Sequence, residues 1–409
     1  MRGLLVFLLV LAGGAFALLL LVTDGRPLVE RGEAISPDAV AQARRLLLTN
    51  DPRRMRPGEQ RRVAVPATLI DDATNYLASR VLHGRGALVM GEDMAEIRLT
   101  RRIPLPIMDR FLNLRAVVNE AAGEPRIAAA ALGSTAIPAR LAEFALAAAV
   151  RAFGYEREWT LARGAVRQLT FEPGRHAVII DFVWAPELLD RARSLAVAPA
   201  DLPRFQQAQT ALAALLDHHR PGAVVPLTSV LAPMLAVNDR QPPEQRRVAL
   251  LVLAFHLAGK NLANIIPDAS RWPRARPVTL TLANREDSAQ HFVISAALAA
   301  WAGEPAADAI GLYKELDDAR YGSGFSFADL AADRAGTRFG ELLTRQPERI
   351  DALMQRALGD ADLLPPLAEL PEYLSEREFR KRFGGPGSST FQKAVEEIDR
   401  RIATVPLYR

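Results

Sequence analysis

The longest apolar run of the chain lies at its N-terminus. Leu4 to Val22 contains only apolar or small residues and no charged side chain. As a helix, this run matches the hydrocarbon core of a bilayer, which is about 30 Å thick. The pattern therefore predicts a transmembrane helix that anchors the chain, within residues 1–25.

A cleaved signal peptide is the alternative interpretation, because Ala15-Phe16-Ala17 resembles a small-residue cleavage site. The apolar run continues from Leu18 to Val22 beyond that site, which favours an uncleaved anchor. Since only a few residues precede the run, we expect them to remain in the cytoplasm. The chain is then expected to be a single-pass protein of the bacterial inner membrane, with its bulk in the periplasm.

Helical and strand patterns alternate after the anchor. A short amphipathic helix is predicted at 34–50, where Ser36-Pro37 is typical of a helix start. Residues 51–62 are rich in Pro, Arg and Gly and predict a linker. Further helices are predicted at 68–82 and 139–153. Alternating or short apolar runs predict strands of a small antiparallel sheet at 86–90, 94–99, 103–106, 111–118, 126–132, 166–171 and 176–184.

Helical patterns dominate the second half of the chain. Residues 188–264 predict helices broken at Pro221-Gly222 and Pro242-Pro243, and 272–282 predict an extended segment. We therefore expect an α+β fold that is predominantly α-helical, with a small antiparallel sheet domain followed by a helical domain. The predicted divisions are a transmembrane anchor at 1–25, a helix and linker at 26–62, a mixed α/β sheet domain at 63–187, a helical region at 188–283, a helical segment at 284–345 and a charged helical tail at 346–409.

Composition narrows the classes of function. The 409 residues are 49% hydrophobic and 24% charged, which is ordinary for a folded protein. The absence of cysteine excludes disulfides, thiolate metal sites and cysteine nucleophiles. The net charge is only +4 and no dense basic run carries aromatic residues, so nucleic acid is not an expected partner. No Walker loop, nucleophile elbow or H-E-x-x-H motif identifies a reaction.

One stretch gathers polar residues that carry chemistry. Asp287 and His291 are four residues apart and share a helix face. Ser326 is a good N-cap for the last predicted helix here, and Asp329 follows it as a variant of the capping box. The candidate polar cluster comprises Asp287, His291, Lys314, Glu315, Asp317, Asp329 and Asp333.

Three interpretations of this cluster stay open. His291, Glu315, Asp329 and Asp333 are a plausible ligand set for a divalent metal ion. Glu315 alone is a candidate general acid or base if burial raises its pKa. A buried structural network is the interpretation that we favour from sequence, with Asp287 orienting His291 and Lys314 paired with an acid.

A stripe of small residues follows the cluster on the same predicted helix. Ala332, Gly336 and Gly340 are spaced four residues apart and so lie along one helix face. We predict that this stripe lets another helix approach closely.

Residues 286–340 resemble a known family in several ordered blocks. The blocks are Asp287-x-x-Gln290-His291-Phe292, Lys314-Glu315-Leu316-Asp317, Gly322-Ser323-Gly324-x-Ser326, and then Asp329, Asp333, Ala335-Gly336 and Gly340. They look like the YfiM-like family of periplasmic lipoproteins, which implies an envelope location and no established activity. The chain departs from a lipoprotein because it has no cysteine to acylate, and the N-terminal helix is expected to take over the anchoring.

Residues 63–146 are similar, over a few positions, to YpmS-like envelope proteins. The shared features are Asn75 in an early helix, the segment Pro104 to Pro106, Leu112-Asn113-Leu114, and Ile137-Pro138 before a helix. We transfer no activity from this similarity.

These features favour a non-catalytic binding or scaffold module that faces the periplasm. The expected partners are the membrane and an envelope protein, peptidoglycan or lipid. The first alternative is a metal-dependent hydrolase that acts on an envelope substrate through His291, Glu315, Asp329 and Asp333, with a divalent metal as its only cofactor. The second is a lipid-binding envelope protein with an apolar groove.

Overall fold

The computed structural model describes residues 22–105, 108–121, 124–189, 191, 197–236 and 243–409. It is an α+β structure with 55% helix, as predicted, and the chain divides into a first unit (Met1–Ala192) and a second unit (Arg193–Arg409). Residues 1–21 of the predicted anchor at 1–25 lie outside the described residues. Within the described part of the chain, no helix is long and apolar enough to cross a membrane.

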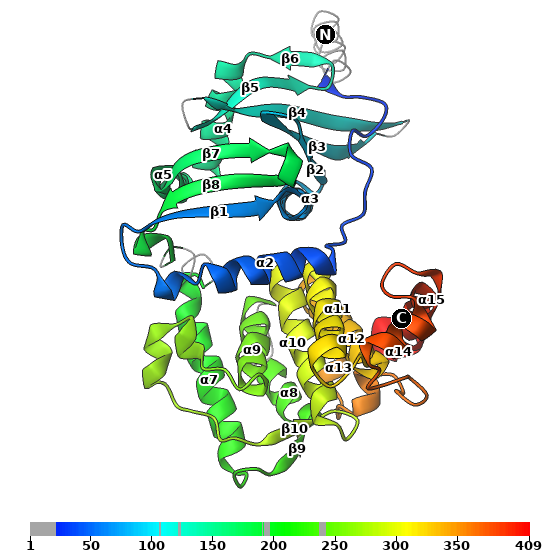
Figure 1. The fold of residues 1–409 in the computed structure, drawn as a ribbon. Coiled ribbons are helices and arrows are strands. Elements are labelled where there is room, and N and C mark those ends of the chain that lie inside the picture. The colour runs from blue at the N-terminus through cyan, green and yellow to red at the C-terminus, as the bar shows by residue number, and fades with distance from the viewer. Residues whose placement is uncertain (1–21, 106–107, 122–123, 190, 192–196, 237–242) are drawn as a thin grey trace, which may run out of the picture. The chain divides into compact units, whose positions relative to one another are not determined.

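The first unit contains two antiparallel sheets (Figure 1). One has the strand order β2-β3-β4-β5-β6 and the other the order β1-β8-β7. The strands are β1 (Gln60–Pro66), β2 (Arg85–Met90), β3 (Met94–Pro104), β4 (Asp109–Ala121), β5 (Glu124–Leu132), β6 (Thr135–Ile137), β7 (Val166–Glu172) and β8 (Ala177–Val183). The helices are α2 (Pro37–Thr49), α3 (Ala67–Leu82), α4 (Ala139–Ala152) and α5 (Glu156–Ala165).

Most elements predicted for this unit are confirmed, and the differences have local causes. The Ser36 cap on α2 is confirmed, because its side chain accepts a hydrogen bond from the backbone of Ala39. The linker prediction for 51–62 was wrong at its end, since β1 begins at Gln60. Its arginines face outward, where Arg62 pairs with Asp181 of β8, with Nε and Oδ1 2.7 Å apart. Strand β6, helix α5 and the division into two sheets were not predicted.

The segment that precedes α2 is tied to the first unit, beginning within the last residues of the predicted anchor. Asp24 forms a β-bridge with Phe111 of β4, and the Asn113 side chain donates a hydrogen bond of 2.7 Å to the Asp24 carboxylate. Further along, Arg31 pairs with Asp71 and Asp72 of α3 at 2.6 and 2.7 Å. Hydrogen bonds and ion pairs therefore hold this segment on the sheet and on α3, from Asp24 onward.

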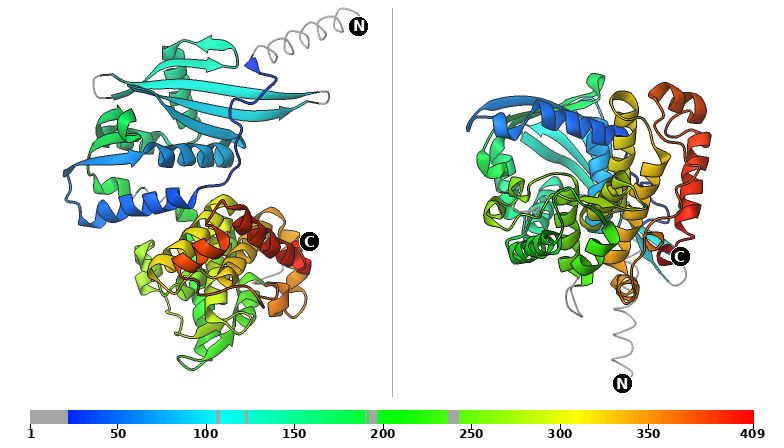
Figure 2. Two further views of the ribbon diagram at one scale, coloured as in Figure 1. Left: turned by 45° about the vertical axis from the view of Figure 1, so that its right-hand side comes forward. Right: turned by 90° about the horizontal axis from the view of Figure 1, so that it is seen from below.

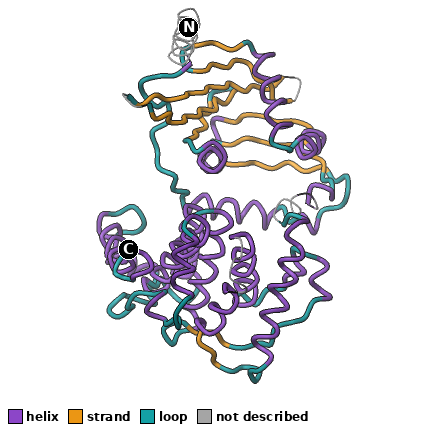
Figure 3. The backbone as a smooth tube through the Cα atoms, turned by 180° about the vertical axis from the view of Figure 1, so that it is seen from behind, coloured by secondary structure: helices purple, strands orange, loops and turns teal. Residues whose placement is uncertain are grey.

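The second unit is almost entirely helical (Figure 3). Its two short strands, β9 (Val224–Pro226) and β10 (Thr279–Thr281), pair in parallel, and only the extended run around β10 was predicted. The helices are α7 (Leu202–Asp217), α8 (Leu227–Ala236), α9 (Pro243–Leu257), α10 (Glu286–Ala302), α11 (Glu304–Tyr321), α12 (Phe327–Arg345), α13 (Pro347–Met354), α14 (Glu376–Phe383) and α15 (Ser389–Ile402).

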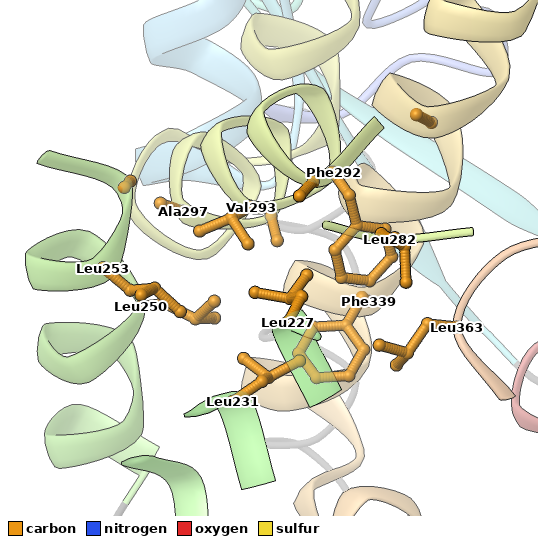
Figure 4. Packing of buried hydrophobic residues seen from close by; sticks show 14 of the residues in the cluster. Leu227, Leu231, Leu250, Leu253, Leu282, Phe292, Val293, Ala297, Phe339 and Leu363 are labelled. Carbon is orange, nitrogen blue, oxygen red and sulfur yellow. The ribbon is translucent and has the colours of Figure 1, made fainter. Parts of the chain in front are cut away.

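The core of the second unit surrounds α10. Leu227 of α8, Leu250 of α9 and Phe339 of α12 close around Phe292 of α10, and all four are fully buried (Figure 4). The helices of the charged C-terminal segment join this core (Figure 2). Phe379 of α14, for example, stacks on the ring of Phe325, with centroids 4.1 Å apart.

Helices α10 and α12 are nearly in backbone contact along the predicted small-residue stripe. A Cβ atom added to Gly336 would lie 2.1 Å from the carbonyl oxygen of Phe292, and one added to Gly340 would lie 2.2 Å from that of Ala296. Ala332, on the same stripe, is fully buried. Only glycine permits this approach, so the stripe sets the distance between the two helices that carry most of the polar cluster.

Candidate functional site

Three consecutive helices bring the centre of the polar cluster together. His291 comes from α10, Glu315 from α11 and Asp329 from the first turn of α12. One ligand atom of each lies within 4.8 Å of the other two. The Nε2 atom of His291 is 3.9 Å from Oε1 of Glu315 and 3.8 Å from Oδ2 of Asp329.

Asp333 orients the imidazole of His291 from behind. Its Oδ1 atom lies 3.1 Å from Nδ1 of His291 and accepts a hydrogen bond of 2.7 Å from the Ser295 hydroxyl. The proton of the neutral imidazole is therefore favoured on Nδ1, which leaves the Nε2 lone pair directed at Glu315 and Asp329. A carboxylate behind a histidine in this way is the usual support for a metal-binding imidazole.

The N-terminus of α12 contributes a cap that differs from the predicted one. The Ser326 side chain accepts a hydrogen bond of 3.0 Å from the Asp329 backbone, so this half of the predicted capping box is confirmed. The return bond was predicted from Asp329, but the Ser326 amide donates to Oε2 of Glu315 instead, over 3.1 Å. The Asp329 carboxylate is thus left to face His291.

Carboxylate oxygens of the cluster are buried without a hydrogen-bond partner among the described residues. They are Oε1 of Glu315, Oδ1 of Asp329 and Oδ2 of Asp333. The Glu315 side chain is only 1% exposed, and its free oxygen is the one that points at His291. A buried charged oxygen without a donor costs free energy, so this arrangement calls for a cation.

The ammonium of Lys314 lies beside His291 and Glu315, on the solvent side of the cluster. Its Nζ atom is 3.1 Å from Nε2 of His291 and 3.5 Å from Oε1 of Glu315. The side chain is half exposed and also donates a hydrogen bond of 2.8 Å to Asp318, one turn along α11. Asp318 therefore offers the ammonium a partner outside the group of converging atoms.

Arg285 and its partners form the rim of the cluster. Arg285 binds both oxygens of Asp287, at 3.0 and 2.8 Å, and pairs with Glu372 at 2.5 Å. The role of orienting His291, which the sequence interpretation gave to Asp287, belongs to Asp333. Asp317 lies half-buried on α11, outside the group of converging atoms.

The predicted cluster did not include Arg285, Ser295 or Glu372. Ser295 follows His291 by four residues and so lies on the same face of α10, which was an available signal. Arg285 and Asp287 also line a shallow surface depression with Glu286, Gln290 and Tyr373, so the rim of the cluster reaches solvent.

The pKa values indicate an excess of negative charge. Burial disfavours the charged imidazole, but the charge of Asp333 outweighs it and raises the pKa of His291 to about 9. Burial, together with the nearby Asp333, raises the pKa of Glu315 to about 7. Burial also raises the pKa of Asp329. The site therefore takes up a further positive charge even with Lys314 beside it.

We expect the metal-free protein to lose stability as the pH rises from 6.5 to about 9. The pKa of His291 is raised from 6.5 to about 9 in the folded chain, so its contribution is fully present below 6.5 and is lost through 9. The loss should be about 3 kcal/mol in the free energy of unfolding. Urea titrations at several pH values, in chelator, measure it. A His291→Gln variant that keeps the same slope would contradict the assignment to His291.

No family model, curated protein or solved structure matches the chain. The chemistry of the site therefore follows from its own geometry. One imidazole nitrogen and two carboxylate oxygens suit Zn²⁺, and also Mn²⁺ or Fe²⁺. Tetrahedral zinc with bonds of about 2.1 Å needs its ligand atoms about 3.4 Å apart. The observed 3.8 and 3.9 Å exceed that spacing by about 0.5 Å, so the ligands would have to draw together around an ion.

Proposed function

We propose that the second unit holds a divalent metal ion between His291, Glu315 and Asp329, with Zn²⁺ as the first candidate. We further propose that the protein is a metal-dependent hydrolase of the bacterial cell envelope. Within this proposal the helix of residues 1–25 anchors the chain in the inner membrane, the bulk of the chain is periplasmic, and residues 286–340 belong to a YfiM-like group.

One observation carries the metal site. The fully buried Glu315 directs an oxygen without a hydrogen bond at Nε2 of His291, whose other nitrogen is already held by Asp333. Six carboxylates surround one imidazole and the two cations Lys314 and Arg285; they are those of Asp287, Glu315, Asp318, Asp329, Asp333 and Glu372. A divalent cation would offset that excess of charge.

The number of protein ligands favours hydrolysis over a purely structural ion. Three protein ligands leave a coordination position for water or substrate, as in catalytic zinc sites, whereas structural sites have four. When bound, the ion supplies a water that ionises near neutral pH and a Lewis acid for a carbonyl or phosphoryl oxygen. Asp333 holds the imidazole, and Lys314, at the solvent side, is placed to pair with an anionic group of the substrate.

The hydrolase proposal is tested with the full chain in detergent. Zinc-loaded protein is incubated separately with peptidoglycan and with phospholipid, and products are identified by mass spectrometry. We expect a product that disappears with chelator and in the Glu315→Gln variant. If neither substrate yields a metal-dependent product while zinc binds stoichiometrically, the hydrolase proposal fails and the metal site stands.

A second candidate function is supported by Lys314. Its ammonium already lies near the unpartnered oxygen of Glu315, so the cluster can be a structural network within a non-catalytic binding or scaffold module. The two candidates differ in what Lys314 does to a metal ion. As a competitor it weakens metal binding, and as a permanent partner it is needed for stability alone.

We expect a Lys314→Met variant to bind zinc more tightly than the unaltered chain. Methionine keeps the apolar stem and removes the charge that competes for Glu315 and His291. The metal-free variant should be less stable by about 1 kcal/mol, because carboxylates lose a partner. Calorimetric zinc titration and urea unfolding measure the two effects. Lys260→Met, at an exposed site of the same unit, is the control. Unchanged or weaker zinc affinity would favour the structural network.

A further inference from the structure

Helix α4 carries exposed apolar side chains on the face that is turned away from the sheet. It lies against β5 (Figure 1), yet none of its residues is buried. Leu141, Phe144, Ala145, Ala148 and Ala152 are all exposed. Their spacing of three or four residues places them on one stripe that faces away from the sheet.

More exposed apolar side chains follow the end of α4. Phe153, Tyr155 and Trp159 lead into α5 and are 61%, 51% and 41% exposed, while Phe144 is 70% exposed. We call these four aromatic residues with Leu141 the α4–α5 apolar surface. Single exposed apolar residues are ordinary, but several large ones so close together in the chain are typical of an interaction site.

We propose that the α4–α5 apolar surface docks on the lipid bilayer beside the N-terminal anchor. The inference rests on the anchoring part of the proposed function and is independent of the metal site. It names the lipid headgroup region of the same membrane as the occupant of the surface.

The attachment of the anchor favours the bilayer as that occupant. The apolar run ends at Val22, and Asp24 is already bound to β4 through Phe111 and Asn113. The backbone carbonyl of Asn113 also accepts a hydrogen bond of 2.7 Å from the amide of Gly133, a residue that lies just before β6 and α4 in the chain. With no slack between the anchor and the sheet, the first unit is held at the membrane surface, where a weak apolar contact is sufficient for docking.

The chemistry of the surface also matches a bilayer interface. Tyrosine and tryptophan rings favour the headgroup level, with phenylalanine and leucine below it. Arg140 and Arg151 lie along one border of the α4 stripe, and both are exposed, as is Arg157. Arg151 also pairs with Glu156 of α5, with Nη2 and Oε1 3.0 Å apart, so Arg140 and Arg157 are the arginines first available to lipid. Guanidinium groups at such a border can pair with anionic phosphates of the lipid.

The lack of cysteine makes a direct test simple. Phe144→Cys is introduced into the full chain, labelled with an environment-sensitive fluorophore, and reconstituted into vesicles of phosphatidylethanolamine and phosphatidylglycerol. Glu92→Cys, in the exposed turn between β2 and β3, is the control. We expect the label at 144 to be quenched by lipids brominated in their acyl chains and to lose accessibility to iodide. The label at 92 should stay open to iodide.

The outcomes separate the anchor from the docking. Protein that floats with the vesicles but shows equal iodide access at both positions would overturn the docking and leave the anchor. Shielding from iodide without quenching by brominated lipid would mean that protein, such as a second copy or residues 1–21, covers the surface, and it would also overturn the docking. Protein that fails to float contradicts both.

A second variant tests the stripe itself. Phe144→Asp should abolish brominated-lipid quenching of a label at Ala148→Cys, because a carboxylate is repelled by anionic lipid and disfavours apolar burial. Leu47→Asp, at a 66% exposed leucine of the same unit, should leave that quenching unchanged. Circular dichroism checks that both variants fold. Retained quenching in Phe144→Asp would overturn the proposal.

Discussion

Replacing His291 with alanine should weaken zinc binding by at least about 100-fold. His291 is the only nitrogen ligand of the proposed site, and its imidazole is held by Asp333 at 3.1 Å with Nε2 directed at Glu315 and Asp329. Removal leaves two carboxylates, which bind zinc poorly at neutral pH when Lys314 competes for them. Calorimetric titration of chelator-stripped full chain measures the change.

Two matched variants show whether the effect is specific to the site. His218→Ala, at an exposed histidine after α7, should keep the original zinc affinity. Asp333→Asn removes the charge behind the imidazole and should cost about 10- to 100-fold, between the two histidine variants. Equal zinc affinity in His291→Ala and His218→Ala would contradict the metal site.

Replacing Gly336 with alanine should destabilise the second unit by about 3 kcal/mol. The added Cβ would lie 2.1 Å from the Phe292 carbonyl oxygen, so α10 and α12 must move apart. Their separation also fixes His291 relative to Asp329 and Asp333. Zinc affinity should therefore fall with stability, although Gly336 itself carries no ligand. Urea unfolding and zinc titration of the same preparation test both effects.

The glycine control lies in α5. An added Cβ at Gly164 meets nothing within 4 Å, so Gly164→Ala should be neutral or should stabilise the protein by up to about 1 kcal/mol. If Gly336→Ala is as stable as the unaltered chain, the helices have room between them and the packing account of the stripe is wrong. If stability falls but zinc affinity does not, the ligands do not depend on the α10–α12 distance.

Local sequence signals predicted most elements and failed where pairing partners are distant. The helices at 34–50, 68–82 and 139–153 have apolar periodicity of their own, and the first also has the Ser36 cap. Strand β1, by contrast, begins with Gln60 and two arginines, and only its pairing with β8, more than a hundred residues later, makes it a strand. The same holds for β9, which pairs with β10 across the whole of α8 and α9.

The candidate site shows the same limit. Spacing within one helix suggested that Asp287 orients His291, because the two lie four residues apart. The structure pairs His291 with Asp333, which lies 42 residues later in the chain. The pairing is possible because Gly336 and Gly340 let α12 pack closely against α10. The glycine stripe was visible in the sequence, but the helix that it contacts was not. Contacts between helices, which sequence spacing does not encode, therefore determine which polar residues meet.

X-ray absorption spectroscopy at the zinc edge, on zinc-loaded full chain, tests the central claim most directly. The proposed site predicts one imidazole nitrogen and at least two oxygen ligands at about 2.0–2.2 Å, with the imidazole signal absent from His291→Ala. A chain that takes up no stoichiometric zinc, or a spectrum that is identical in His291→Ala, would contradict it.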